Sequence, residues 1–272
     1  PGKIGLPGKW PSKKNSSFST EAGLKYFLLG SFSSALLLFG MSILYGCTGT
    51  TNFENFTLLL SGVDLDNFST TSSISNALLF VGAAAKSAQI PLHFWLPDSM
   101  EGPTPISALI HAATMVTAGI FMIARLSPLY DLSEYVLDLI LFIGVATAFF
   151  MGLVALVQND IKRIIAYSTI SQLGYMTVAL GASYYSFAIY HLLTHAFFKA
   201  LLFLCAGSII LKCHHEQDIN RMGGLRKLMP LTFATFTIAG FSLIGFPSMS
   251  GFFSKDLIID IFKYEGNSIV YY

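Results

Sequence analysis

A lysine in the middle of a long apolar stretch is the feature that most constrains how this chain can fold. Residues 73–97 are mostly small or apolar, which predicts a membrane-crossing helix, and Lys86 lies near its centre. A charge at mid-membrane depth costs about 2.5 to 3.5 kcal/mol on insertion scales, so such residues usually face a bundle interior or a watery cavity. Lys86 is about ten residues from either predicted end, roughly 15 Å, which is too far for its side chain to reach the interface. We therefore expect Lys86 to be functional.

Helix breakers follow this lysine. Pro91 removes a backbone donor and tends to kink or break the helix that carries it. Broken helices at membrane depth are tolerated where they line a cavity, and they mark binding sites in transporters. The stretch is therefore typical of a membrane-embedded site rather than of a plain anchor.

The composition supports a membrane protein without any motif. Hydrophobic residues make up 53% of the 272 residues and charged residues only 11%, whereas a soluble domain is about 25% charged. The net charge of +1 and the absence of long like-charge runs indicate no nucleic-acid partner. The sequence predicts an all-α polytopic membrane protein whose first partner is the lipid bilayer.

The apolar stretches predict seven or eight crossings. Residues 1–20 form a polar, basic N-terminal lead, which we expect to be an exposed end or a truncated start, and residues 21–272 form the membrane domain. The seven continuous stretches are residues 21–46, 73–97, 103–125, 134–157, 164–180, 184–211 and 231–246. A Pro/Gly break follows the seventh stretch, so we expect the eighth to be incomplete or interrupted.

The basic residues indicate an orientation. With seven crossings, the N-terminal lead and the loops near residues 98–104, 158–163 and 212–227 fall on one face. That face carries Lys3, Lys9, Lys13, Lys14, Lys162, Arg163, Lys212, Arg221, Arg226 and Lys227. The opposite loops offer little beyond Arg125. By the positive-inside rule, we expect the N-terminus on the cytoplasmic or matrix side.

The sixth crossing contains a row of titratable side chains. His191, His195 and Lys199 are spaced i, i+4 and i+8, so they share one helical face over a length of about 12 Å. A histidine can accept and donate protons near neutral pH, and a desolvated lysine can join it, so the row is typical of a proton relay. The alternative is that each histidine only bonds a neighbouring helix, but three groups in register favour the relay.

Three further candidates carry weaker signals. His111 is equally compatible with a satisfied core histidine and with a relay member. Lys255 and Asp256 follow the break at residues 247–251, where the alternative is an ion pair at a helix end.

The loop after the sixth crossing could be mistaken for a metal site. Its candidate ligands are Cys213, His214, His215 and Glu216. They are consecutive and no second ligand pair is visible, so the pattern indicates a solvated loop instead. No pattern in the chain indicates a bound redox cofactor.

Several long motifs resemble the antiporter-like subunits of respiratory NADH:quinone oxidoreductase (complex I), closest to subunit 5. They are KSAQIPLHFWLPDSMEGPTPISALIHAATMVTAGIFMIAR, QNDIKRIIAYSTISQLGYM, HLLTHAFFKALLFLCAGSII, EQDINRMGGLRK and GFPSMSGFFSKD, and the likeness covers residues 73–262. The resemblance implies a proton-translocating subunit with inverted repeats and interrupted helices. It implies other complex I membrane subunits as partners, with NADH, FMN, iron–sulfur clusters and quinone in partner subunits and no cofactor in this chain.

The resemblance also implies a relay through Lys86, His111, His191, His195, Lys199, Lys255 and Asp256. In it, Lys86 resembles the central lysine of the first half-channel, and Lys255 resembles the lysine of the second interrupted helix. His111 resembles the histidine of the helix after Lys86. In this reading, quinone reduction elsewhere in the assembly drives protons along the row.

The chain departs from the family pattern at its ends. The stretch STEAGLKYFLLGSFSSALLLFGMSILYGCTGTTNF resembles subunit 2 more than subunit 5, which predicts a join within residues 51–75. The family's earlier helices, one of which carries the glutamate that partners the central lysine, have no counterpart here, and neither does the long C-terminal lateral helix. The chain thus resembles about half of a family member.

Three functional hypotheses follow. The first is a proton-channel subunit of the redox-driven complex, in the mitochondrial inner membrane or a bacterial plasma membrane. The second is a cation/proton antiporter subunit of the related multi-subunit type, which shares these motifs. The third is a truncated or chimeric subunit without independent activity.

Overall fold

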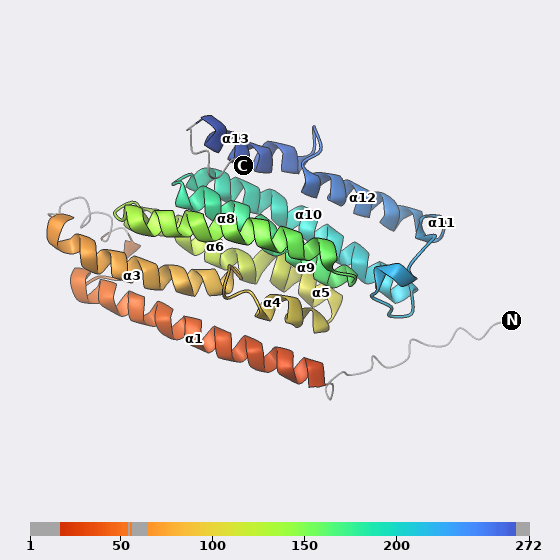
Figure 1. Cartoon of the computed structure of the whole chain (residues 1–272), viewed down its shortest axis with the longest axis horizontal. Coiled ribbons are helices and arrows are strands. Elements are labelled where there is room, and N and C mark those ends of the chain that lie inside the picture. The colour runs from red at the N-terminus through yellow and green to blue at the C-terminus, as the bar shows by residue number, and fades with distance from the viewer. Residues whose placement is uncertain (1–16, 54, 56–64, 265–272) are drawn as a thin grey trace.

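The structure is an elongated bundle of long helices in which the chain runs back and forth (Figure 1). This computed structural model describes residues 17–53, 55 and 65–264, of which residues 17–19, 65–70, 111–113 and 261–264 are described without their side chains. The longer helices are α1 (Ser17–Thr48), α3 (Leu65–Lys86), α6 (Met115–Arg125), α8 (Glu134–Val157), α9 (Ile161–Gly181), α10 (Tyr185–Lys212) and α12 (Pro230–Ile244). The shorter ones are α4 (Trp95–Asp98), η2 (Ser99–Glu101), α5 (Thr104–Ser107), η3 (Ala108–Thr114), α7 (Ser127–Tyr130), η4 (Ile219–Arg221), α11 (Leu225–Leu228), η5 (Phe252–Asp256) and α13 (Leu257–Tyr264). The all-α fold class is confirmed.

Among the described residues, four helical runs are long and apolar enough to cross a membrane. They are Thr20–Thr48, Thr104–Arg125, Glu134–Val157 and Tyr185–Lys212. With 22 and 21 residues, α3 and α9 also have the length of a crossing, but they carry more polar side chains. The predicted seventh stretch corresponds to α12, which is shorter at 15 residues.

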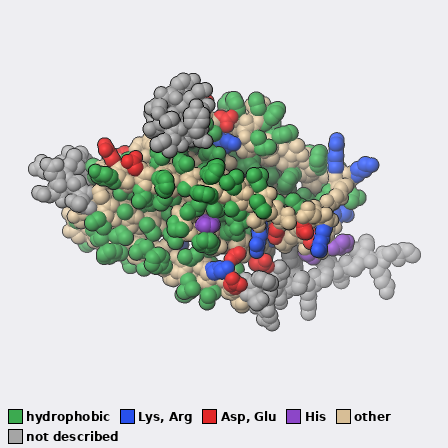
Figure 2. Space-filling view, in the orientation of Figure 1, with side chains coloured by type: hydrophobic (Ala, Val, Ile, Leu, Met, Phe, Trp, Pro, Cys, Tyr) green, Lys and Arg blue, Asp and Glu red, His purple; other side chains and the backbone are tan. Residues whose placement is uncertain are grey.

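The outside of the bundle is apolar. Figure 2 shows hydrophobic side chains over the middle of the visible face, with most charged side chains towards its ends and edges. Phe142 of α8 and Phe197 of α10 are 73% and 74% exposed. A soluble protein rarely exposes an apolar surface of this extent, whereas lipid covers such a surface at no cost.

The predicted helix over residues 73–97 is wrong at both ends. The helix α3 begins at Leu65 and ends at Lys86, so this lysine is the last residue of a helix rather than its middle. Residues 87–94 then form turns, because Pro91 cannot donate to a helical hydrogen bond and Ala88 has a left-handed φ of 53°. The indole Nε1 of Trp95 donates to the carbonyl of Ala85 at 2.9 Å and so ties the two sides of the break together.

Small residues let α8 and α9 approach closely. A Cβ added to Gly174 of α9 would lie 2.6 Å from the backbone nitrogen of Ala148. A Cβ added to Gly181 would lie 2.5 Å from the backbone nitrogen of Leu141. Only glycine fits at these two points, as is common where membrane helices pack backbone to backbone.

The three loops predicted to share one face lie at one end of the bundle, whereas residues 1–16 of the N-terminal lead are outside the described residues. The amide of Ile161 donates to the carbonyl of Gln217 at 3.1 Å, which joins the start of α9 to the loop after α10. Lys162 Nζ donates to the carbonyl of Gly102 at 3.1 Å, and Lys25 pairs with Asp98 at 2.8 Å. These contacts bring the start of α1, the connection after α4 and both loops together.

The chain breaks again after α12, as predicted for the eighth stretch. Gly245 has a φ of 88° and ends α12, and the chain re-enters helical structure only near Gly251. A side chain at Gly251 would collide with the carbonyl oxygen of Ser242. The segment that follows, η5, is a π-helical turn, a form that is common at functional sites.

Candidate functional site

The predicted row on α10 is buried in the bundle. His191, His195 and Lys199 have no measurable exposure, and their helix packs against α9, α12 and η3. The i, i+4, i+8 spacing places all three on the same side of α10, away from exposed residues such as Phe197. Buried polar groups need hydrogen-bond partners, so the neighbouring helices decide what this row can do.

The ammonium of Lys199 is held by α9. Its Nζ donates to Ser168 Oγ at 2.7 Å and to the carbonyl of Ile165 at 3.3 Å. No carboxylate pairs with it in the described part of the chain. Neutral oxygens around a buried amine stabilise a charge less than a carboxylate does, so the site allows Lys199 to give up and regain its proton.

His191 has a partner on each ring nitrogen. Its Nε2 lies 3.1 Å from Gln172 Oε1, and its Nδ1 lies 2.9 Å from Ser254 Oγ. Gln172 comes from α9 and Ser254 from η5, so this histidine joins three segments of the fold.

His195 lies between the other two members of the row. Its ring centroid is 6.2 Å from that of His191, and its ring packs edge-on against Phe198 at 5.4 Å. Neither of its ring nitrogens has a hydrogen-bond partner among the described residues. The distance excludes a direct bond between the two histidines, so a proton would need an intervening water to pass between them.

Lys86 lies at the break after α3. It is half-buried and lines a cavity of about 10 Å³ together with Tyr26 and Ser33 of α1 and Met115 of α6. A cavity of this size holds about one water. No hydrogen bond or ion pair joins the side chain of Lys86 to another residue in the described part of the chain. The structure therefore places this lysine against α1, at a discontinuity of the helix.

Lys255 and Asp256 both lie near the end of α12, against the consecutive residues Ile244 and Gly245. Lys255 Nζ donates to the carbonyl of Ile244 at 3.1 Å and lies 5.8 Å above the ring centroid of Tyr175. The carboxylate of Asp256 lies next to Gly245, where an added Cβ would come within 3.2 Å of Oδ1. Within the described residues, the two side chains form no ion pair with each other.

The backbone of His111 lies in η3, but its side chain is outside the described part of the chain. The structure brings His191, His195 and Lys199 together and places Ser254, the residue before Lys255, against the same row. The transport roles of all seven candidates stay predictions.

The sequence did not indicate the buried or half-buried positions of four polar residues. Ser168 and Gln172 are spaced i, i+4 on α9, which puts them on the face that meets α10. Ser254 was hidden in an irregular segment. Lys162 was counted as a loop charge, yet it is only 4% exposed, and its Nζ also lies 3.4 Å from the carbonyl of Met100. The i, i+4 spacing of polar residues inside an apolar helix was the signal for the first pair.

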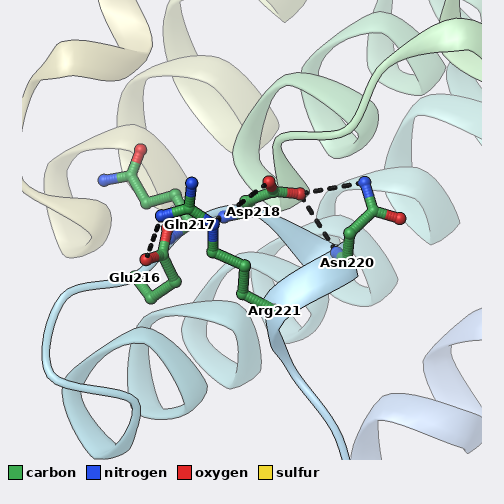
Figure 3. A network of polar contacts seen from close by, with 5 residues as sticks. All are labelled: Glu216, Gln217, Asp218, Asn220 and Arg221. Atoms are coloured by element: carbon green, nitrogen blue, oxygen red, sulfur yellow. Dashed lines mark hydrogen bonds and ion pairs between the residues drawn. The ribbon is translucent and has the colours of Figure 1, made fainter.

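In the loop after α10, hydrogen bonds and an ion pair hold the carboxylate of Glu216 (Figure 3). Glu216 Oε1 accepts from the amides of Gln217 and Asp218 at 3.3 and 3.4 Å, and Oε2 pairs with Arg221 at 3.3 Å. The hydrogen bond from the Asp218 amide and the nearby guanidinium hold the pKa of Glu216 below its ordinary value. This carboxylate supports the loop fold.

Comparison with known proteins gives a consistent result. Residues 10–270 match the family model described as "NADH:quinone oxidoreductase/Mrp antiporter, TM". The NADH-quinone oxidoreductase subunit L of Neisseria meningitidis is 53% identical over 99% of this chain and 41% of its own length. The NADH-ubiquinone oxidoreductase chain 5 of Phytophthora infestans is 49% identical over 89% of this chain and 38% of its own length. The chain thus spans less than half the length of these relatives.

A solved structure extends the comparison to the fold. The Mrp complex from Dietzia contains a chain that matches with a TM-score of 0.84 and 26% identity, over 94% of this chain and 47% of that one. The alignment to the Neisseria relative also runs through the N-terminal stretch. A single relative therefore matches both stretches that the sequence analysis assigned to two paralogues.

Proposed function

This chain belongs to the NADH:quinone oxidoreductase/Mrp antiporter family of membrane proteins, and we propose that it serves as a proton-translocating membrane subunit of an NADH:quinone oxidoreductase. The observation that carries the proposal is the buried row of His191, His195 and Lys199 on α10. Ionisable groups inside a membrane bundle are costly and mark ion or proton pathways. The 53% identity to a subunit of such an enzyme supports the choice of complex.

The row supplies the elements of a proton path. Lys199 can release its proton because, among the described residues, its amine is held by Ser168 and a backbone carbonyl and by no carboxylate. His195 can take up that proton on whichever ring nitrogen carries no hydrogen and release the hydrogen of the other nitrogen by way of water towards His191. His191 then contacts the segment that carries Lys255 through Ser254. In this proposal, Lys86 feeds the row through His111, and Asp256 assists Lys255 at the far end.

The driving force comes from other subunits in this proposal. Quinone reduction elsewhere in the complex changes the electrostatic field along the bundle, and this change shifts the proton affinity of Lys86 and Lys199. NADH, FMN, iron–sulfur clusters and quinone would be bound by partner subunits. The membrane would be the mitochondrial inner membrane or a bacterial plasma membrane, with the basic end of the bundle on the matrix or cytoplasmic side.

A second candidate is a subunit of a cation/proton antiporter. The match to a chain of the Mrp complex, with a TM-score of 0.84, favours it specifically. Sodium-dependent proton exchange that continues without NADH or quinone would identify this function. The higher identity to NADH-quinone oxidoreductase subunits favours the first candidate.

The proposal is tested by separating a mild-detergent membrane extract by native size. We expect this chain to comigrate with NADH-oxidising, quinone-reducing activity. Comigration with a complex that lacks this activity but exchanges sodium for protons would support the antiporter instead. A chain that runs alone, outside any complex, would contradict both candidates.

A further inference from the structure

Ser254 is the point where the second helix break meets the buried row. Its hydroxyl lies 2.9 Å from Nδ1 of His191, 2.9 Å from Oγ1 of Thr194 and 3.1 Å from the carbonyl oxygen of Ser250. Ser254 is only 1% exposed, so water does not compete freely for these contacts. The hydroxyl hydrogen of Ser254 thus has three acceptors within reach: His191 Nδ1, Thr194 Oγ1 and the carbonyl of Ser250. Which one it bonds depends on where the neighbouring groups carry their own hydrogens.

The neutral form of His191 determines one arrangement. Gln172 Oε1 can only accept, so Nε2 of His191 carries the ring hydrogen and donates it across 3.1 Å. Nδ1 is then an acceptor, and the Ser254 hydroxyl donates to it. Thr194 Oγ1 can in turn donate to Ser254 Oγ, so every hydrogen in the group has a partner.

When His191 is protonated, the same heavy-atom positions allow a second arrangement of hydrogen bonds. Nδ1 of His191 now carries a hydrogen and donates it to Ser254 Oγ. The Ser254 hydroxyl turns to the carbonyl of Ser250 at 3.1 Å, and the Thr194 hydroxyl turns to the carbonyl of His191 at 3.0 Å. The two forms differ by one proton on the ring and by two hydroxyl rotations, and neither leaves a polar group unsatisfied.

We propose that Ser254 is a positioning residue for His191, whose hydroxyl reverses between donor and acceptor so that both protonation states of the buried imidazole stay hydrogen-bonded. The inference rests on the proposed function and deepens it, since it explains why the π-helical turn η5 contacts the row. Without this hydroxyl, Nδ1 would be buried without a partner in both protonation states, which is costly in a low-dielectric interior. Proton passage through His191 would then slow.

Among the described side chains, the titratable neighbours of His191 come from α10 and η5. His195 lies on the same helix, with its ring centroid 6.2 Å away, and Lys255 follows Ser254 on η5. On α9 the facing group is the uncharged Gln172, with Tyr175 one turn further on and beneath Lys255. A change at Ser254 leaves all of these groups in place, so its effect can be assigned to the hydroxyl.

The test compares Ser254→Ala, Ser254→Thr and Ser254→Cys in the assembled membrane complex, with quinone-dependent proton translocation as the readout. We expect Ser254→Ala to slow translocation about tenfold, since a buried nitrogen loses its partner. Ser254→Thr keeps a hydroxyl and should restore most of the rate, and Ser254→Cys, a weaker donor, should fall between them. Ser242→Ala is the control, because Ser242 is also buried, at 7% exposure, but its hydroxyl donates to the carbonyl of Ile238 on its own helix.

His191→Gln separates this inference from the proposed function. If His191→Gln lowers translocation but Ser254→Ala does not, Ser254 has no positioning role, although the row still conducts. If His191→Gln leaves translocation unchanged, His191 does not carry protons and the proposed proton path is refuted. If the Ser254→Ala complex does not assemble, Ser254→Thr is compared with Ser254→Cys instead. Equal translocation rates in these two variants would overturn the inference.

Discussion

Ser168 of α9 lies 2.7 Å from the ammonium of Lys199 on α10, and this contact fixes the buried lysine to the neighbouring helix. Ser168→Ala would leave the amine with only the carbonyl of Ile165 at 3.3 Å. Polar contacts between membrane helices contribute about 0.6 kcal/mol on average. We expect a modest loss of thermal stability and a slower proton translocation, measured on the purified complex.

The control for Ser168→Ala is Ser208→Ala. Both serines are half-buried, but Ser208 donates only to the carbonyl of Cys205 within its own helix. Ser208→Ala should leave translocation unchanged. Equal effects of the two substitutions would show that the contact with Lys199 has no special role.

The close approach of α8 and α9 predicts a large difference between two glycine substitutions. Gly174→Ala would place a methyl group 2.6 Å from the backbone nitrogen of Ala148, so the helices must separate. Overpacking of this kind costs about 1 to 3 kcal/mol. Gly152→Ala is the matched control on the same helix pair, because its nearest neighbour is Ser171 Oγ at 3.6 Å.

Thermal unfolding of the two glycine variants in detergent measures this difference. We expect a clearly lower Tm for Gly174→Ala and an unchanged or slightly higher Tm for Gly152→Ala. Similar Tm values for both variants would mean that α8 and α9 can move apart without loss of stability.

The loop after α10 should weaken in acid. Because the pKa of Glu216 is lowered in the folded chain, its contribution is present above the unfolded value of about 4.3 and is lost as the pH falls through the lower folded value. Glu216→Gln should mimic the acid form at pH 7 and speed the hydrogen exchange of the Gln217 and Asp218 amides. Glu134→Gln, in the first turn of α8, is the control; unchanged exchange in Glu216→Gln would refute the assignment.

The continuous apolar stretches were enough to predict most of the long helices. The fourth predicted crossing coincides with α8, and the sixth differs from α10 by one residue at each end, because long apolar runs leave few other ways to satisfy a backbone in lipid. The second crossing failed at Lys86, since its apolar residues continue through a turn that Pro91 forces. The apolar stretch and Pro91 indicate a broken helix, but they do not say at which residue the helix ends.

The candidate site could be predicted only in part. The i, i+4, i+8 spacing located the row on α10, since that relationship is local to one helix. The partners Gln172 and Ser254 depend on which helix packs against which, and this is set by contacts far apart in the sequence. Lys162 was misplaced for a similar reason, because the carbonyls that receive its amine belong to a different segment.

In the proposed relay the buried amine of Lys199 carries protons, and one measurement tests this role directly. The assembled complex is reconstituted in liposomes, and proton uptake driven by quinone reduction is compared between Lys199→Met and Lys212→Met. Both changes remove a lysine from α10, but Lys212 lies exposed at the end of that helix. We predict that Lys199→Met lowers the number of protons translocated per quinone reduced while Lys212→Met does not. An unchanged ratio in Lys199→Met, with an intact complex, would show that Lys199 does not carry the translocated protons.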